Sequence, residues 1–283
     1  MNNQLTWEHP PKWLLWIVLP LVVGLLIASS VVPQPIVGVI RLSDAIYAQT
    51  ARDLITQINY AMDHPEVRAV VLVFDSPGGT VVDTEAIYME LERLRAKKPV
   101  ITAINGMAAS GAYYLSVGSD YIYAKPTSLV GNVGVIGYLP PTPLVFEDII
   151  STGPYKLWGA PRDSDMRQID MIKQSFYEAV RLGRGEERLK ADRDTILRGQ
   201  IWAGTEALRL GLIDEIGTEN DAVRKAAQMT RIWHYKTADL YSLAGIQAQA
   251  YSFFMQSPEG VTLPYPKESG MYLLYIPPLP LEK

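Results

Sequence analysis

The chain has 283 residues, of which 48% are hydrophobic and 20% charged, enough for one large domain or two small ones with a substantial core. The formal net charge is −4 and there is no long basic run, which argues against nucleic-acid binding. Cysteine is absent, so disulfides, thiolate zinc sites and cysteine catalysis are excluded. The His, Asp and Glu residues form no cluster with metal-ligand spacing. We therefore expect neither a metal nor a cofactor.

An apolar, uncharged segment occupies residues 13–32. About 20 such residues cross a bilayer as a helix, and Pro20 is tolerated in such a helix. A cleaved signal peptide is the alternative, with Ala-Ser-Ser at 28–30 as a weak cleavage site. We expect an uncleaved anchor preceded by a cytoplasmic segment at 1–12. Because Lys12 lies on the short side, the positive-inside rule predicts a single-pass protein of the cytoplasmic membrane with an extracytoplasmic body.

Beyond the apolar segment, strand patterns and helix patterns alternate. Strands are expected at 36–42, 69–74, 99–105, 120–124 and 133–136, and helices at 49–63, 84–97, 166–190 and 222–229. The continuous apolar run Ala69–Phe74 is typical of a buried parallel strand. The alternation predicts an α/β domain with a mainly parallel sheet and flanking helices.

We place this domain at residues 36–230. Residues 231–283 are expected to form a C-terminal extension, in which Pro and aromatic residues dominate from Tyr251 on. We expect this extension to be irregular and to pack on the body or on a neighbouring subunit.

A run of small residues at 103–114 (Ala-Ile-Asn-Gly-Met-Ala-Ala-Ser-Gly-Ala-Tyr-Tyr) joins a predicted strand to a predicted helix. Ser110 lies at this junction, where its hydroxyl points out of the sheet edge and backbone N–H groups favour negative charge. That position suits a nucleophile. The alternative is a serine that caps or packs the helix.

A nucleophilic serine needs a group that takes its proton. The three histidines (His9, His64 and His234) lie in no motif, so a Ser-His-Asp triad is not indicated. A lysine can act instead if burial keeps its amine neutral. Lys156 is the strongest candidate because apolar and aromatic residues flank it, and Lys125 is a rival. A solvated surface charge remains the alternative for either lysine.

The loop at 75–79 (Asp-Ser-Pro-Gly-Gly) directly follows the buried strand that ends at Phe74. Two glycines after a strand let the backbone approach a ligand closely and point an N–H group at it. Such donors stabilise the oxyanion formed in acyl transfer. An ordinary Pro-Gly turn is the alternative.

Five segments, taken in chain order, carry a family resemblance. They are Phe74–Gly79, Ala108–Tyr114, Gly131–Ile136, Gly153–Arg162 and Ala207–Gly217. Together they resemble the bacterial signal peptide peptidase A family of serine–lysine proteases. The same core fold occurs in the proteolytic subunit of Clp protease and in the crotonases. The likeness spans residues 36–230, so we expect a Clp protease/crotonase-like core.

The resemblance implies roles for particular residues. Ser110 would be the nucleophile and Lys156 the general base, while Gly79 and Gly111 would donate the N–H groups of the oxyanion hole. The family usually has a serine that holds the lysine amine where this chain has Asn132. An amide oxygen can also accept from an amine, so we expect Asn132 to orient the lysine.

The resemblance also implies a function. By this resemblance, the protein would be a membrane-anchored serine endopeptidase that cleaves apolar peptides, such as remnant signal peptides, through an acyl-enzyme. The resemblance further implies an octamer-like homo-oligomeric ring whose dyad is shared between subunits, with residues 13–32 in contact with lipid. Two alternatives stay open. One is a catalytically inactive membrane scaffold of the same fold, for which Asn132 is the main support, and the other is a crotonase-like enzyme acting on acyl thioesters.

Overall fold

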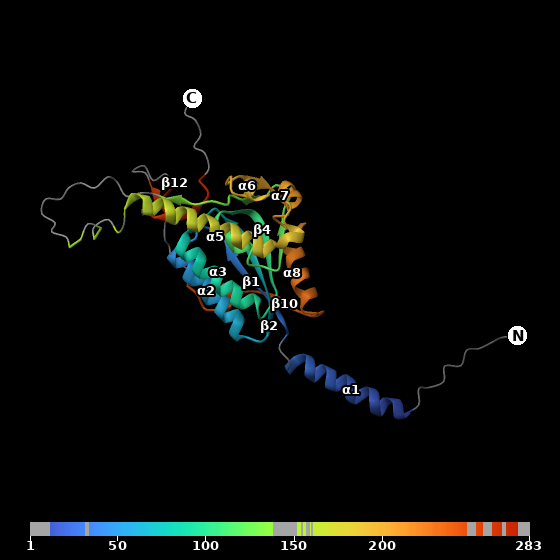
Figure 1. Ribbon diagram of the computed structural model, residues 1–283. Helices are drawn as coiled ribbons and strands as arrows, with labels where there is room; N and C mark the ends of the chain where they lie inside the picture. Colours follow the sequence, from blue (N-terminus) through green and yellow to red (C-terminus); the bar gives the residue numbers. More distant parts are fainter. Residues whose placement is uncertain are drawn as a thin grey trace.

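A twisted sheet with helices on both faces forms the body of the protein (Figure 1). The computed structural model describes residues 12–31, 34–137, 152–153, 155–156, 159, 161–247, 253–256, 262–267 and 270–276. The main sheet has eight strands, in the order β10-β1-β2-β4-β5-β9, with β6 joining β4 and β8 joining β6. Its strands are β1 (Ile36–Leu42), β2 (Val67–Ser76), β4 (Val100–Ala109), β5 (Tyr121–Ala124), β6 (Leu129–Gly131), β8 (Ile201–Ala203), β9 (Glu215–Ile216) and β10 (Lys236–Asp239).

The pairings in this sheet are parallel except for the antiparallel pair of β6 and β8. The expected α/β class is therefore confirmed, with a mixed sheet in place of a wholly parallel one. The helices of the body are α2 (Ala48–Asp63), α3 (Val81–Arg95), α4 (Gly111–Ser116), α5 (Arg162–Arg188), α6 (Arg193–Ile196), α7 (Gly204–Leu210), α8 (Glu219–Met229) and α9 (Leu240–Leu243).

Strand β2 shows why its sequence is continuously apolar. Val70, Leu72 and Phe74 pack in the larger core cluster, on the face covered by α2 and α3. The alternate residues Ala69 and Val71 pack in a second cluster beneath α8. Because successive side chains of a strand point to opposite faces, a strand covered on both sides needs apolar residues at every position.

The region after β6 differs from the expected strand at 133–136. The chain leaves β6 at Gly131, whose φ is 110°, and Asn132 follows with a φ of 57°. Positive φ values interrupt an extended strand, so strand structure resumes only at β7 (Ile136–Gly137). The pattern of apolar residues did not reveal this turn.

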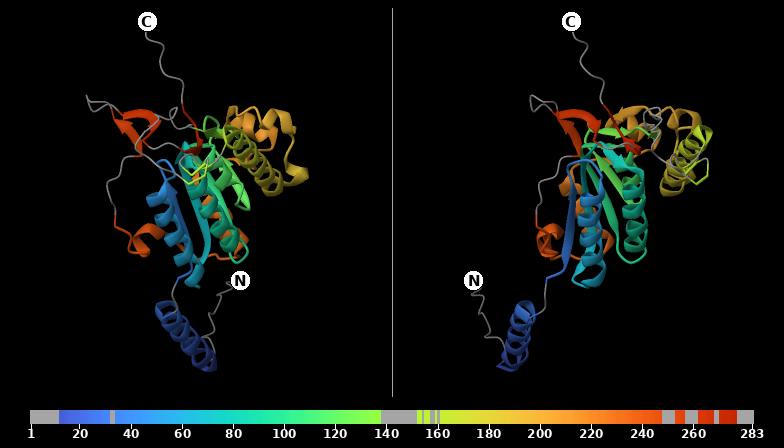
Figure 2. Two further views of the ribbon diagram at one scale, coloured as in Figure 1. Left: turned by 60° about the vertical axis from the view of Figure 1, so that its left-hand side comes forward. Right: turned by 90° about the vertical axis from the view of Figure 1, so that its left-hand side faces the viewer.

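The C-terminal part also contains strands that its Pro-rich composition hides. They are β11 (Phe254–Gln256), β12 (Thr262–Pro266) and β13 (Met271–Leu274). β11 pairs with β12, and β13 pairs with β7 and with β3 (Gly78–Thr80). Figure 2 shows these orange-to-red strands across the end of the sheet where β2 and β4 finish. The division of the chain at residue 231 stays a prediction, although β10 joins the main sheet from beyond it.

Helix α1 (Lys12–Val31) forms at the apolar segment and lies apart from the body (Figures 1 and 2). Pro20 lies inside it, and Ser29 and Ser30 lie in its last turn. Within the part of the chain that the structure describes, no helix meets the length and apolarity needed to cross a membrane. The expected single-pass anchor at 13–32 and the location in the cytoplasmic membrane are therefore not supported. Residues 1–11 of the expected cytoplasmic segment lie outside the described residues.

Candidate active site

Two loops that follow neighbouring parallel strands meet at one edge of the sheet. The first runs from the end of β2 through Pro77 into β3, and the second joins β4 to α4. Ser76 is the register partner of Ala108, two residues before Ser110. Since the carboxyl ends of parallel strands lie at the same sheet edge, this is where an open α/β sheet places its ligands.

Ser110 has an unusual backbone conformation, with φ 52° and ψ −117°. A non-glycine residue held in such a region costs about 1–3 kcal/mol and is found preferentially at functional sites. The backbone is held on both sides, because its N–H donates to Gly131 O at 2.8 Å and its carbonyl accepts from Tyr114 N at 2.9 Å. Ser110 is 1% exposed, and its hydroxyl makes no capping hydrogen bond to α4. The structure therefore gives no support to the helix-capping alternative.

The two glycines of β3, Gly78 and Gly79, lie in different surroundings. A Cβ atom on Gly78 would lie 2.6 Å from Gly111 N, whereas one on Gly79 would lie 1.8 Å from Ile46 O. Gly78, with a φ of 93°, is thus the glycine beside the backbone N–H that follows Ser110. The family resemblance implies Gly79 as a donor, and that assignment stays a prediction; the sequence pattern alone does not distinguish the two adjacent glycines.

Asn132 lies in the turn that follows β6. Its side-chain Nδ2 donates to Gly199 O at 2.7 Å, and its backbone N–H donates to Gln200 O at 2.8 Å. Asn tolerates the left-handed region better than most residues, since its short side chain can hydrogen-bond locally. This turn borders a cavity of about 370 Å³ that Lys173 and Arg198 also line. Asn132 therefore has a structural role in the described chain, tying β6 to the segment that leads into β8.

Lys156 lies in a short exposed turn, whose closing contact runs from Lys156 N to Gly153 O at 3.5 Å. Most of the segment between β7 and α5 lies outside the described residues. Among the contacts that are described within one chain, none brings Lys156 to Ser110. Lys125, the rival candidate for the base, follows β5. Its backbone N–H donates to Ser128 Oγ at 3.2 Å.

An apolar cavity of about 490 Å³ adjoins the same sheet edge. Asp75, Ser76 and Pro77 line it together with Met107 and Leu129. Leu263 and other C-terminal residues complete the wall. Binding pockets of this size are typically apolar with a few polar groups. The sequence did not indicate this cavity, because its walls come from segments far apart in the chain.

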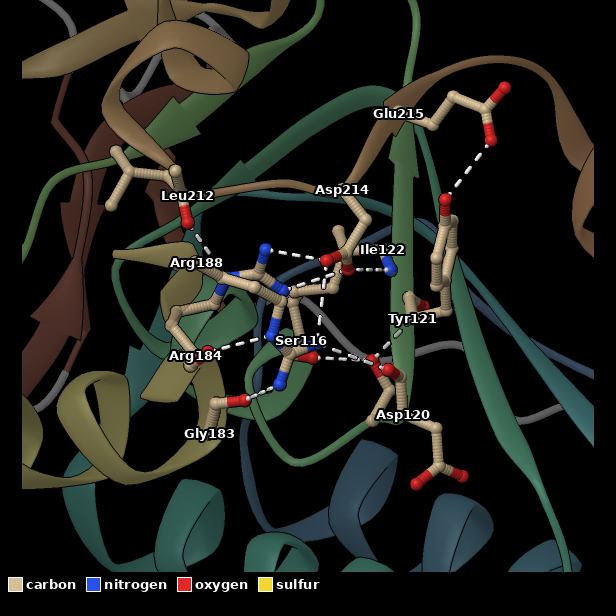
Figure 3. A network of polar contacts seen from close by, with 12 residues as sticks. Ser116, Asp120, Tyr121, Ile122, Gly183, Arg184, Arg188, Leu212, Asp214 and Glu215 are labelled. Atoms are coloured by element: carbon tan, nitrogen blue, oxygen red, sulfur yellow. Dashed lines mark hydrogen bonds and ion pairs between the residues drawn. The ribbon is translucent and has the colours of Figure 1, made fainter. Parts of the chain in front are cut away.

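A buried ion-pair network holds α5 to the body (Figure 3). Arg184 is 1% exposed, and its two terminal nitrogens each lie 2.8 Å from an oxygen of Asp214. Arg188 adds a contact of 3.3 Å to the same carboxylate. Burial alone would raise the pKa of Asp214, but the hydrogen bonds and charge of Arg184 outweigh it and lower that pKa.

Helix α5 also packs directly on α4. A Cβ on Gly183 would lie 2.2 Å from Val117 O, just past the end of α4, and the rings of Phe176 and Tyr114 are 4.9 Å apart. The helix that follows the Lys156 segment is thus fixed against the helix that follows Ser110. The sequence did not reveal this link, since Arg184 lies in a run of charged residues that is typical of a solvated helix face.

Comparisons with known proteins agree with this architecture. The sequence profile of peptidase family S49 matches residues 92–232, and that of Clp protease matches residues 36–129. Protease 4 of Salmonella typhi is 34% identical over 194 residues, which cover 63% of this chain and 31% of Protease 4. The Synechocystis protein slr0021, named as a candidate protease, is 31% identical over 207 residues, covering 67% of this chain and 73% of that protein.

A candidate signal peptide peptidase SppA of Enterococcus faecium is 28% identical over 188 residues, which cover 61% of this chain and 54% of that protein. The chain thus spans 31% of the length of Protease 4 but 73% of slr0021. With a relative matched over most of its length and an S49 profile that covers the Ser110 region, the chain belongs to peptidase family S49.

Proposed function

We propose that this protein is a serine endopeptidase in which Ser110 is the nucleophile and Lys156 the general base. The observation that carries the proposal is the strained, buried Ser110, whose hydroxyl does not cap its helix and whose following residue, Gly111, has its backbone nitrogen beside Gly78. Membership of a peptidase family supports the reaction class. Apolar peptides, such as remnant signal peptides, are the proposed substrates, and the apolar cavity beside Ser76 suits them.

The reaction proceeds by acyl transfer. Ser110 Oγ attacks the peptide carbonyl while the Lys156 amine takes the hydroxyl proton. The negative charge on the carbonyl oxygen is stabilised by the Gly111 N–H and by a second N–H from the glycines at 78–79. The lysine then returns the proton to the leaving amine, and water hydrolyses the acyl-enzyme. Gly78 adjoins Gly111 N, but its own N–H donates to Ser76 Oγ at 3.2 Å, so we propose either of the two glycines as the second donor.

A lysine can serve as the base only if its amine is neutral near pH 7, which requires burial. Lys156 is exposed in the single chain. We therefore propose that a neighbouring subunit buries it and that the dyad is completed between subunits, in a ring such as an octamer. In that arrangement the oxygen of Asn132 is the acceptor that orients the amine, while its nitrogen remains bonded to Gly199.

The direct test uses purified protein and an apolar fluorogenic peptide. Ser110→Ala should abolish cleavage, and a fluorophosphonate should label the wild type but not this variant. Circular dichroism of both proteins is the control for folding. Undiminished cleavage by Ser110→Ala would rule out the nucleophile. A wild type that neither cleaves nor becomes labelled would favour the inactive scaffold.

A further inference from the structure

Strand β13 lies between β3 and β7, beside the residues proposed to form the oxyanion hole. It is antiparallel to both, with Tyr272 opposite Thr80, Leu273 opposite Gly79 and Leu274 opposite Gly78. One residue further on, Tyr275 N donates to Pro77 O at 2.7 Å. Two leucines of β13 are almost fully buried, with Leu273 at 0% and Leu274 at 1% exposure.

The backbone of β13 passes over the glycines beside Ser110. Leu273 O lies 2.0 Å from the position that a Cβ on Gly78 would take and 3.1 Å from the corresponding position on Gly111. Glycine is needed at Gly78 because a side chain there would collide with this carbonyl, whereas a Cβ on Gly111 would first meet Thr84 Oγ1, at 2.8 Å. A backbone carbonyl of the chain itself thus lies next to the residues that we propose receive the carbonyl of a substrate.

The other edge of β3 is already used. Thr80 N donates to Ile46 O at 2.9 Å, and Ile46 N donates to Gly78 O at 2.8 Å. An extended peptide binds a sheet by adding a strand to an open edge. A peptide that binds beside Gly78 and Gly111 could therefore pair with β3 at one edge, and β13 occupies that edge.

We propose that β13 occupies the edge of β3 at which a substrate peptide would pair, and that β13, without β11 and β12, must withdraw before a substrate pairs with β3. This inference rests on the proposed function. Withdrawal is feasible because β13 has four residues and its partners β3 and β7 have three and two, and short segments near a chain end open locally at lower cost than the core. The apparent affinity for peptide then falls by the fraction of chains that are open.

The register offers a reversible lock. Since Thr80 N points to Ile46, Thr80 and Tyr272 form a non-hydrogen-bonded antiparallel pair, whose Cα atoms lie about 4.5 Å apart. This is within the span of a disulfide, about 4.4–6.8 Å, and the chain has no cysteine of its own. Thr80→Cys with Tyr272→Cys therefore joins β13 to β3 on oxidation and frees it on reduction. The two single variants are the matched controls.

Binding is measured first, in a Ser110→Ala background, by the fluorescence anisotropy of a labelled apolar peptide. The oxidised pair should bind at least about tenfold more weakly than the reduced pair, while the single variants should not respond to the redox state. Cleavage by the same pair with Ser110 intact should show the same loss and recovery. Equal binding in both redox states overturns the proposal for β13. If Ser110→Ala still cleaves, it is the nucleophile assignment that fails.

A second measurement avoids substitutions altogether. Hydrogen exchange of the wild type with saturating apolar peptide should speed up at the amides of residues 271–275, because bound peptide displaces them. Exchange in β2 and β4 should stay unchanged. If peptide binds and the exchange of 271–275 does not change, β13 is a permanent strand of the fold and the proposal is wrong.

Discussion

The two proposed catalytic groups lie in contrasting parts of the molecule. Ser110 is buried between the ends of two central strands, with both backbone polar groups bonded. Lys156 lies in an exposed turn before α5, in a segment of which little is described. The fold of one chain is thus sufficient to position Ser110, whereas Lys156 would need further burial to act as the proposed base. This difference predicts which substitutions affect chemistry, which affect stability and which affect assembly.

The largest effect is expected at Lys156 itself. Lys156→Ala removes the proton acceptor, so kcat for peptide cleavage should fall at least about 10³-fold with the thermal stability unchanged. Lys125→Ala is the matched control, since Lys125 is the rival lysine, and it should keep most of the activity. If Lys125→Ala lost activity and Lys156→Ala kept it, Lys125 would be the general base, and the contrast between the two regions would no longer hold.

The next effect concerns the attachment of α5. Arg184→Ala removes the two 2.8 Å ion-pair contacts of the buried Asp214 carboxylate and leaves it with the weaker 3.3 Å contact of Arg188, which we expect to cost about 3 kcal/mol of unfolding free energy. The stability can be measured by urea unfolding. Arg93→Ala is the control, because the Arg93 side chain is 62% exposed in its pair with Glu90, and it should change the stability little. Similar losses for the two variants would show that the network does not hold α5.

A smaller effect is expected at Asn132. Asn132→Ser removes the bond to Gly199 O and places a less suitable residue at a φ of 57°, so we expect a loss of about 1–2 kcal/mol. The serine restores the residue that the signal peptide peptidase A family usually has, and cleavage should persist. Loss of cleavage in a stably folded Asn132→Ser protein would show that the amide itself is required.

The smallest expected effect is a change in how the unfolding free energy depends on pH under acidic conditions. Because the folded pKa of Asp214 is lowered by Arg184, the pair stabilises the fold fully above the unfolded value of about 3.9 and loses this contribution as pH falls through the folded pKa. Unfolding free energies between pH 6 and pH 3 should therefore decline less steeply in Arg184→Ala than in the wild type. Parallel pH profiles would contradict this assignment.

Much of the body could be predicted from the sequence, because α2 carries a helical pattern and β1 and β2 are almost continuously apolar. The predicted strand at 36–42 coincides with β1. The features that the sequence did not predict depend on backbone turns and on contacts between segments far apart in the chain. The turn at Asn132 results from positive φ values that apolar patterning does not show, and β13 exists because β3 and β7 offer it edges.

Some features of the candidate site could likewise be predicted from the sequence, and others needed the structure. The junction at Ser110 was visible as a strand followed by small residues and a helix, and the structure places it at the end of β4. The backbone path was needed to see that Gly78, and not Gly79, lies beside Gly111 N. The Arg184–Asp214 pair joins residues 30 positions apart, and charge patterning along one helix does not reveal such a pair.

The central claim is that Ser110 and Lys156 act together across a subunit boundary. Mixing the inactive Ser110→Ala and Lys156→Ala chains tests it most directly, after dissociation and joint reassembly. Our account predicts that the mixture regains peptide cleavage, because some interfaces combine an intact Ser110 with an intact Lys156. A mixture that co-assembles, as shown by co-purification of two different tags, and yet stays inactive would contradict a shared dyad.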